Sequence, residues 1–204
     1  MKLNTDNIDL SLIILAGGRS SRMGHPKPWL RKENGITFLN DIITSYRQFG
    51  IDNIIVVLNE EFTQNDWEEN FLAINKKAII IKNNQVDKGR LHSLQLGLSH
   101  SSSALNIIHN VDNPFVEYKV LTELLADIEN QEIIIPTYND IGGHPVIINK
   151  NVKTEITSNY KKYNTLKDVF SKFKKKYVNV DSNTILININ TPKDLETLFY
   201  EPVL

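Results

Sequence analysis

The chain has 204 residues, of which 41% are hydrophobic and 23% are charged, and its formal net charge at pH 7 is −1. This composition is ordinary for a folded globular protein, and the near-zero charge excludes a general electrostatic attraction to nucleic acid or to an anionic membrane. The absence of cysteine excludes disulfides, a thiol nucleophile, thiolate–zinc sites and iron–sulfur clusters.

No segment of the sequence is typical of membrane insertion or secretion. No apolar run approaches the roughly 18–20 residues that a membrane-spanning helix needs. Asp6 and Asp9 interrupt the N-terminal segment, where a signal peptide would be apolar. We therefore expect a cytoplasmic protein.

Short apolar segments alternate with longer amphipathic segments, and residues 1–10 are expected to be a loose N-terminal extension. Strands are expected at residues 11–16, 54–58, 78–81, 107–111 and 133–135, with further extended segments at 144–148, 177–180 and 185–187. Helices are expected at residues 38–49, 66–74, 89–100, 118–128, 166–173 and 193–199.

This alternation predicts right-handed βαβ units and hence an α/β protein: a mostly parallel, Rossmann-like sheet in a three-layer α/β/α arrangement. The sequence contains no internal repeat or linker, so residues 1–204 are expected to form one domain. In open α/β sheets, ligands bind beyond the carboxyl ends of the strands. We therefore expect the loops after the first, third and fourth strands, and the loop at Gly142 and Gly143, to meet at one edge of the sheet.

The most informative segment covers residues 15–27, Leu-Ala-Gly-Gly-Arg-Ser-Ser-Arg-Met-Gly-His-Pro-Lys, directly after the first expected strand. The adjacent glycines Gly17 and Gly18 allow the backbone to approach a ligand closely, and successive N–H groups in such a turn form an anion site. Full positive charge is added by three side chains, Arg19, Arg22 and Lys27. These features predict a polyphosphate-binding loop, and the alternative is a surface turn with solvated cations.

The segment matches neither common phosphate-binding motif. The Gly-x-Gly-x-x-Gly spacing is absent, and five residues rather than four separate Gly18 from Gly24, which is followed by His25 rather than lysine. The pattern Leu-Ala-Gly-Gly-x-Ser-x-Arg-Met-Gly-x-Pro-Lys instead resembles the signature of the MobA-like nucleoside-triphosphate transferases, and the resemblance runs from residue 13 to about residue 198.

The resemblance implies a fold of the nucleotide-diphospho-sugar transferase type. It also implies a reaction that adds a nucleotide to a phosphorylated acceptor and releases pyrophosphate. Arg22 and Lys27 match the residues that hold the triphosphate and are the implied catalytic cations. The other implied nucleotide contacts in this segment are Leu15, Ala16, Gly17, Gly18, Arg19 and Ser20.

A second motif covers residues 88–98, Lys-Gly-Arg-Leu-His-Ser-Leu-Gln-Leu-Gly-Leu. It resembles a helix start of the molybdenum cofactor cytidylyltransferase branch, which implies that Gly89 and Ser93 lie near the nucleotide and help to select the base. A helix N-terminus offers free N–H donors, and serine adds a hydroxyl. The alternative is a helix cap without a ligand.

A third motif, Asn-Val-Asp-Asn-Pro-Phe at residues 110–115, follows the fourth expected strand. The Asp112 carboxylate can extend its oxygens to the sheet edge, and Mg²⁺ prefers such hard oxygen ligands together with nucleotide phosphates. The resemblance implies that Asp112 coordinates Mg²⁺, with Mn²⁺ as the alternative metal. The other interpretation is an aspartate that caps a helix.

A fourth motif, at residues 138–145, contains Gly-Gly-His-Pro before an extended segment. Its Gly-His-Pro again resembles the cytidylyltransferase branch, where this loop faces the acceptor. We therefore assign Gly143 and His144 to acceptor binding, with His144 as a hydrogen-bond donor to an acceptor phosphate. The alternative is a structural histidine.

A fifth motif, Asn-Ile-Asn-Thr-Pro-Lys-Asp-Leu, covers residues 188–195. Asn190 stands at the position of the second metal or phosphate contact, where cytidylyltransferases usually have aspartate; an amide oxygen can bind Mg²⁺ but adds no charge. Guanylyltransferases often have asparagine in this stretch, and Gly17 stands where cytidylyltransferases usually have alanine. These two departures favour GTP, whereas the second and fourth motifs favour CTP.

The other histidines and the lysine-rich segments are weaker candidates. His25 is a further candidate phosphate contact, and His92, His100 and His109 are expected on helix or strand surfaces. Basic patches at residues 161–162 and 172–176 are interpreted as a solvated face, with steering of an anionic acceptor as the alternative.

The resemblance implies transfer of CMP from CTP to the phosphate of molybdopterin. A phosphate monoester has a second pKa of about 6 and is mostly dianionic at pH 7, so the reaction needs no protein nucleophile. Positioning and charge stabilisation by Mg²⁺, Arg22 and Lys27 would drive it. The alternatives are GTP as the donor, a sugar phosphate as the acceptor, and a chaperone that binds nucleotide or finished cofactor without turnover. A molybdenum hydroxylase is the implied client, and neither nucleic acid nor a membrane is an expected partner.

Overall fold

The computed structural model describes residues 9–126, 128 and 130–200. The expected N-terminal extension therefore lies outside the described residues except for Asp9 and Leu10. Leu10 already belongs to the first strand, so that strand begins one residue earlier than expected.

The described strands form one eight-stranded sheet in the order β3-β2-β1-β4-β7-β5-β6, with β8 also paired to β5. Their bounds are β1 Leu10–Ala16, β2 Ile54–Asn59, β3 Ile79–Asn83, β4 Leu105–Asn110, β5 Ile133–Tyr138, β6 Ile141–Gly142, β7 Val146–Ile148 and β8 Lys175–Asn179. The pairs β1–β2, β2–β3, β1–β4 and β5–β8 are parallel. The expected mostly parallel sheet is confirmed, and only β6 and β7 run antiparallel to their neighbours.

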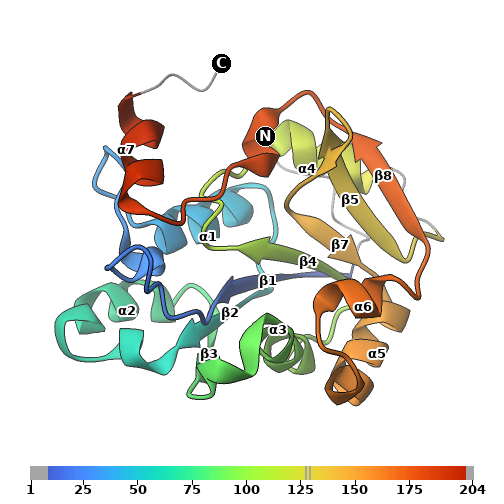
Figure 1. The fold of residues 1–204 in the computed structure, drawn as a ribbon, viewed down its shortest axis with the longest axis horizontal. Helices are drawn as coiled ribbons and strands as arrows, with labels where there is room; N and C mark the ends of the chain where they lie inside the picture. Colours follow the sequence, from blue (N-terminus) through green and yellow to red (C-terminus); the bar gives the residue numbers. More distant parts are fainter. Residues whose placement is uncertain (1–8, 127, 129, 201–204) are drawn as a thin grey trace.

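Helices cover both faces of this sheet (Figure 1), which confirms the three-layer arrangement. Their bounds are α1 Phe38–Gln48, α2 Glu68–Asn75, α3 Gly89–Ser99, α4 Tyr118–Leu125, α5 Lys150–Asn159, α6 Leu166–Phe170 and α7 Pro192–Tyr200. Short 3₁₀ turns occur at Lys27–Trp29 (η1), Glu60–Thr63 (η2), Asn65–Trp67 (η3), Val86–Lys88 (η4), Tyr160–Lys162 (η5) and Asn183–Leu186 (η6).

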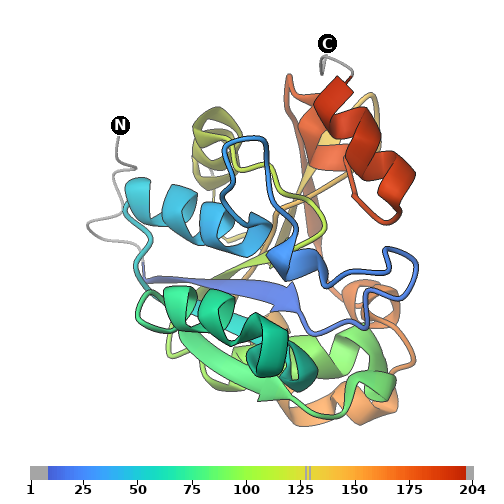
Figure 2. The same cartoon turned by 90° about the vertical axis from the view of Figure 1, so that its left-hand side faces the viewer.

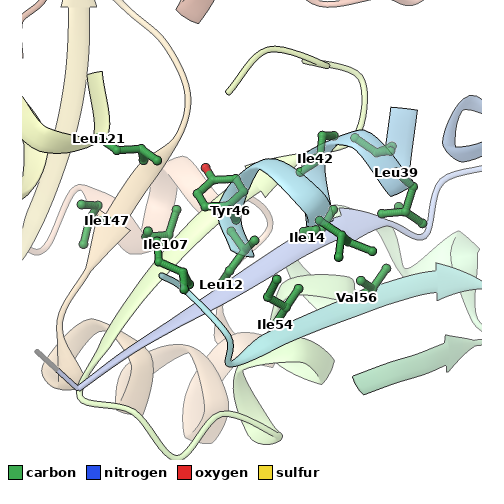
Figure 3. Packing of buried hydrophobic residues seen from close by; sticks show 14 of the residues in the cluster. Leu12, Ile14, Leu39, Ile42, Tyr46, Ile54, Val56, Ile107, Leu121 and Ile147 are labelled. Atoms are coloured by element: carbon green, nitrogen blue, oxygen red, sulfur yellow. The ribbon is translucent and has the colours of Figure 1, made fainter. Parts of the chain in front are cut away.

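Alternate residues of β1 point to opposite faces of the sheet, as the period of a strand requires. Leu12 and Ile14 lie on one face, in a cluster with Leu39, Ile42 and Tyr46 of α1 (Figure 3) that also includes residues of α4. Ile13 and Leu15 pack against α3 on the other face, in a cluster that also includes α5 and α6. Because β1 is buried on both faces, its sequence is a continuous apolar run rather than an alternating one.

Two local predictions are wrong. The expected strand at 185–187 is replaced by η6, whose first turn is capped by the Ser182 side chain accepting a bond from the Thr184 N–H. Helix α5 was not expected at all, because only Val152 and Ile156 of its ten residues are buried and the rest are polar. Two apolar positions are too few for a periodic pattern to stand out.

No helix in the described part of the chain is long and apolar enough to cross a membrane. The loop after β1 and helix α7 lie at the same end of the molecule in Figure 2, although they are far apart in sequence. They are joined by a small apolar cluster in which Met23, Leu30 and Phe38 pack with Ile189, Leu195 and Leu198.

Candidate functional site

A cleft of about 340 Å³ opens at the carboxyl ends of β1 and β4 and at the start of α3. This is the edge at which parallel strands with a shared direction end together, as the register Leu15↔Asn110 shows. The predicted site residues that line it are Leu15, Ala16, Gly17, Gly18, Ser20, Arg22, Lys27, Gly89, Ser93, Asp112 and Asn190. The expected meeting of the loops after the first, third and fourth strands is confirmed, whereas neither Gly142 nor Gly143, whose loop was expected to join them, lines this cleft.

The loop after β1 is shaped by Ser20, which has a positive φ of 54°. Its carbonyl oxygen accepts bonds from the N–H groups of Met23 and Gly24 at 3.0 and 3.2 Å. Its hydroxyl accepts a bond from the backbone N–H of Lys27 at 3.0 Å. The serine thus folds the loop back on itself and fixes the backbone from which the Lys27 side chain enters the cleft.

Lys27 joins the loop to two other parts of the chain. Its Nζ donates to Asn190 Oδ1 at 2.8 Å and lies 3.3 Å from Asp112 Oδ2. Arg22 also donates to Asn190 Oδ1, at 3.1 Å. Three separate sequence motifs therefore converge on one cluster that carries two positive charges and one negative charge.

Asp112 is held in place through its own backbone. Its carbonyl oxygen accepts a bond from the Ile189 N–H at 2.7 Å, and the neighbouring Val111 N–H donates to the Leu15 carbonyl at 3.1 Å. The carboxylate oxygen Oδ1 is buried without a hydrogen-bond partner. An ionised oxygen in that condition is costly unless a cation or donor meets it, so this atom is suited to a metal ion.

A buried histidine, His109, holds the loop that carries Asp112 through a hydrogen bond to Asn113. His109 Nε2 donates to the Asn113 carbonyl at 2.7 Å, and the Tyr46 hydroxyl donates to His109 Nδ1 at 2.9 Å. Burial lowers the pKa of His109 to about 4, so the ring is neutral. The expectation that His92 and His109 lie on the surface is wrong, because their exposed fractions are only 7% and 0%.

Asn190 is positioned by the start of α7. The Asp194 carboxylate accepts bonds from the backbone N–H groups of Asn190 and Thr191, both at 2.9 Å. These bonds, the Asn190 one first, lower the pKa of Asp194. The Thr-Pro-x-Asp sequence is thus a helix start that also orients the cleft residue in front of it.

The opposite side of the cleft is formed by Gly17 and the first turn of α3. Asn83 Nδ2 donates to Ser93 Oγ at 3.1 Å. A Cβ atom on Gly17 would lie 3.1 Å from Ser93 Oγ and 3.2 Å from Asn83 Nδ2, whereas a Cβ on Gly18 would face open space. Gly89, with φ of 77°, forms the turn that enters the helix.

Four of the predicted residues lie outside this cleft: Arg19, Gly143, His25 and, at a second cleft, His144. Arg19 Nη2 donates to both carboxylate oxygens of Asp87, each at 2.7 Å, and Arg19 does not line the cleft. Gly143 is buried against the Ile185 carbonyl, 2.4 Å from an added Cβ, which explains a glycine there by packing. His25, a weaker candidate, packs edge-on against Trp67 at 4.8 Å and is also absent from the cleft.

His144 lies at the wall of a second cleft of about 330 Å³. Asn110 Nδ2 donates to His144 Nε2 at 2.8 Å, which places the imidazole proton on Nδ1. That Nδ1 atom is buried without a partner. Burial, followed by the charge of Arg90 and by His109, lowers the pKa of His144 to about 3.

Arg90 is the main cleft residue that the sequence reasoning missed. It lines both clefts and therefore stands between them. The signal was present, because Arg90 lies between the matched residues Gly89 and Ser93 of the second motif. The other cleft residues not predicted are Ser21, Pro28, Val86, Asn110 and Val111.

The protein alone supplies few metal ligands. Among residues 9–126, 128 and 130–200, no group of three or more His, Cys, Asp or Glu side chains could hold a metal ion. The Asp112 and Asn190 oxygens remain as donors, and a bound nucleotide would add phosphate oxygens. Such a mixed set suits Mg²⁺, which is usually bound by one or two carboxylates together with substrate phosphates and water.

Residues 12–177 match the model of the MobA-like NTP transferase domain. The chain is 30% identical over 209 residues to a probable molybdenum cofactor guanylyltransferase of Natranaerobius thermophilus, with 94% of this chain and 95% of that protein covered. It is 26% identical over 193 residues to the molybdenum cofactor cytidylyltransferase of Escherichia coli, with 92% and 94% covered. Among solved structures, the manganese complex of Rv0371c from Mycobacterium tuberculosis matches with a TM-score of 0.70 and 21% identity, covering 95% of this chain and all of that one.

Proposed function

This chain belongs to the MobA-like NTP transferase domain family and is a nucleotidyltransferase, and on that premise we propose that it transfers CMP from CTP to the phosphate of molybdopterin with release of pyrophosphate. The observation that carries the proposal is the meeting of Lys27, Asp112 and Asn190 in one cleft. Positive charge for a triphosphate and a metal-binding carboxylate face each other there. Relatives named as molybdenum cofactor cytidylyl- and guanylyltransferases support the acceptor.

The residues of the cleft have different roles in this reaction. Arg22 and Lys27 neutralise the charge that develops on the departing pyrophosphate, and the glycine-rich loop brings its N–H groups to the phosphates. The acceptor phosphate attacks the α-phosphorus, one P–O bond forms as the bond to pyrophosphate breaks, and no proton transfer is required. Positioning and electrostatics therefore account for catalysis.

We assign Mg²⁺ to the Asp112 side of the cleft, with Mn²⁺ as the alternative. The buried, unpartnered Asp112 Oδ1 supports this assignment, as does the manganese named for the structurally similar Rv0371c. Asn190 Oδ1 is the second oxygen donor, and it also accepts bonds from Lys27 and Arg22. The metal, when bound, supplies charge neutralisation of the phosphates.

The choice of CTP rests on the first turn of α3, where Gly89 and Ser93 line the cleft in a motif similar to that of the cytidylyltransferase branch. GTP is the second candidate, because Gly17 lacks the methyl group that cytidylyltransferases usually carry there and so leaves more room beside Ser93. A sugar phosphate is the alternative acceptor. A non-catalytic carrier of cofactor remains the alternative outside enzyme chemistry, and a molybdenum hydroxylase is the proposed client.

Two measurements test the proposal. The first is pyrophosphate release with molybdopterin, a divalent metal and each of CTP, GTP, UTP and ATP. We expect CTP to give the highest kcat/KM, and a higher value for GTP would reassign the donor. The second is thermal stability with each nucleotide. Saturating binding at 100 times the Kd should stabilise the fold by about 2.7 kcal/mol, and binding without any pyrophosphate release would indicate the non-catalytic carrier.

A further inference from the structure

Asn113, the residue directly after Asp112, is only 1% exposed. Its backbone N–H donates to the Asn110 carbonyl at 3.1 Å, and its own carbonyl accepts the bond from His109. Its side-chain Oδ1 accepts a bond from the Phe115 N–H at 3.2 Å. These three bonds stay within the loop, and they leave the side-chain Nδ2 group to make contacts outside it.

The Nδ2 group of Asn113 links the loop to η6, a turn 71 residues away at Thr184. It donates to the Thr184 carbonyl at 3.1 Å and to the Ile185 carbonyl at 3.3 Å, so both of its hydrogens are used. A second side chain of the same segment holds the same turn. The Glu117 carboxylate accepts bonds from the hydroxyls of Ser182 and Thr184. The segment after Asp112 therefore grips η6 with two side chains.

This contact bears on the position of Asn190 relative to Asp112. The chain runs directly from the end of η6 to Asn190. Asn113 holds the beginning of this stretch, and the bond from the Ile189 N–H to the Asp112 carbonyl holds its end. Asp112 and Asn190 carry the two oxygens that we assign to the metal. Because Mg²⁺ requires near-ideal ligand geometry, its affinity depends on how firmly the two attachments fix these oxygens.

We propose that Asn113 is a positioning residue of the metal site, which acts by fixing the separation of Asp112 and Asn190. This inference rests on the proposed nucleotidyl transfer and adds the residue that orders its two metal-binding side chains. Asn113 does not line the cleft, so its effect on the metal is transmitted through the loop and η6. Loss of such an outer partner typically lowers metal affinity by about 10–100-fold.

The experiment removes the bonds to η6 and keeps the local turn. In the variant Asn113→Ser, the hydroxyl can still accept from the Phe115 N–H, but it is too short to reach the carbonyls of η6. We measure Mn²⁺ affinity by electron paramagnetic resonance with CTP bound and again with GTP bound, together with the Tm of the full chain. We expect the Mn²⁺ affinity to fall by about tenfold and the nucleotide affinity without metal to equal that of wild type.

The matched control is Asn106→Ser. Asn106 lies in β4, the strand that leads to the Asp112 loop, and it is also a completely buried asparagine whose Nδ2 donates to a backbone carbonyl. It lines neither cleft. Both variants should lower the Tm, and only Asn113→Ser should weaken Mn²⁺ binding. Equal losses of Mn²⁺ affinity in the two variants, or wild-type affinity in Asn113→Ser, would overturn the proposal.

A double-mutant cycle tests whether Asn113 acts through Asp112. In an Asp112→Asn background, Asn113→Ser should lower the Mn²⁺ affinity much less than it does alone, because one of the ligands that it positions is already lost. Additive losses would overturn the positioning role. If Asn113→Ser does not fold, Glu117→Ala replaces it, since this half-buried residue holds the same turn. We expect a smaller loss of Mn²⁺ affinity there, and an unchanged affinity would contradict the proposal.

These binding measurements need no turnover, which separates the inference from the proposed function. A loss of Mn²⁺ affinity in Asn113→Ser, in a protein that releases no pyrophosphate, would leave the positioning role standing while the proposed function fails. Full pyrophosphate release with equal Mn²⁺ affinity in wild type and Asn113→Ser would have the opposite meaning.

Discussion

Lys27 Nζ lies 2.8 Å from Asn190 Oδ1, although the two residues are 163 positions apart in the chain. The contact fixes the lysine between the glycine-rich loop and the start of α7, and only 12% of its side chain is exposed. A lysine held this way has lost most of its rotamer freedom before ligand binds. Its charge is therefore already placed where a phosphate would arrive, which is the condition for electrostatic preorganisation.

Replacing Lys27 with alanine should reduce kcat/KM by about 10²–10³, because one preorganised charge is removed from the transition state. The fold should persist, since the surrounding bonds of Ser20 and Asp194 involve backbone groups that the substitution leaves in place. Steady-state pyrophosphate release measures the effect. Lys193→Ala serves as the control, as Lys193 is exposed on α7 and does not line the cleft; a Lys27→Ala enzyme with the activity of that control would contradict the assigned role.

Replacing Asp112 with asparagine should weaken metal binding in the presence of nucleotide by at least tenfold and reduce kcat/KM by about 10²–10³. The change keeps the shape of the side chain but removes the charge whose Oδ1 atom is buried without a partner. Titration of Mn²⁺ by electron paramagnetic resonance, with CTP bound, reports the affinity. The matched control is Asp181→Asn, because that carboxylate is 90% exposed. Unchanged Mn²⁺ affinity in the Asp112 variant would move the metal elsewhere.

Replacing Gly17 with alanine should raise the preference for CTP over GTP on the order of tenfold, the usual effect of one methyl group in a binding pocket. The added Cβ lies within 3.2 Å of Ser93 Oγ and Asn83 Nδ2, so that pair must shift by a few tenths of an ångström. The ratio of kcat/KM values for the two nucleotides is the measurement. If the contact with Ser93 is the cause, the double variant Gly17→Ala/Ser93→Ala should regain the original ratio, and a preference that ignores Ser93 would refute this explanation.

The cleft at Lys27 and Asp112, where we propose that the nucleotide binds, was largely predictable because its parts follow strand ends. Parallel strands that share a direction deliver the residues after them to one edge, and Gly17, Lys27 and Asp112 each follow or extend such an end. Asn190 was predicted as a site residue on a different basis, its position before a Thr-Pro helix start. No periodicity marks that position, and the resemblance to a known family supplied it.

The second cleft was harder to predict from the sequence, because it depends on the direction of a strand that the hydrophobic pattern does not give. The wall at His144 exists only because β7 runs antiparallel between β4 and β5, and an extended segment does not reveal its direction. Lys167 and Lys175, which line this cleft, belong to a lysine-rich stretch in which solvated residues cannot be told from lining ones by composition. Arg90 was not predicted because the resemblance of the second motif assigns roles only to Gly89 and Ser93, and a single arginine in a helix is usually solvated.

The buried His109 predicts how stability depends on pH. Burial holds its pKa at about 4 in the folded protein against 6.5 for the free side chain, with Asp112 opposing and Lys32 assisting this shift. Between pH 6.5 and 4 the unfolded chain therefore binds a proton that the folded chain does not, so the free energy of unfolding falls as pH falls through this window. Between pH 7.5 and 5.0 the loss assigned to this residue is about 2 kcal/mol. Urea unfolding of wild type and His109→Gln at both pH values tests it, since glutamine can still bond Tyr46 and Asn113 but cannot titrate. The variant should lose less stability on acidification than wild type, and equal losses in the two proteins would show that the pH dependence arises elsewhere.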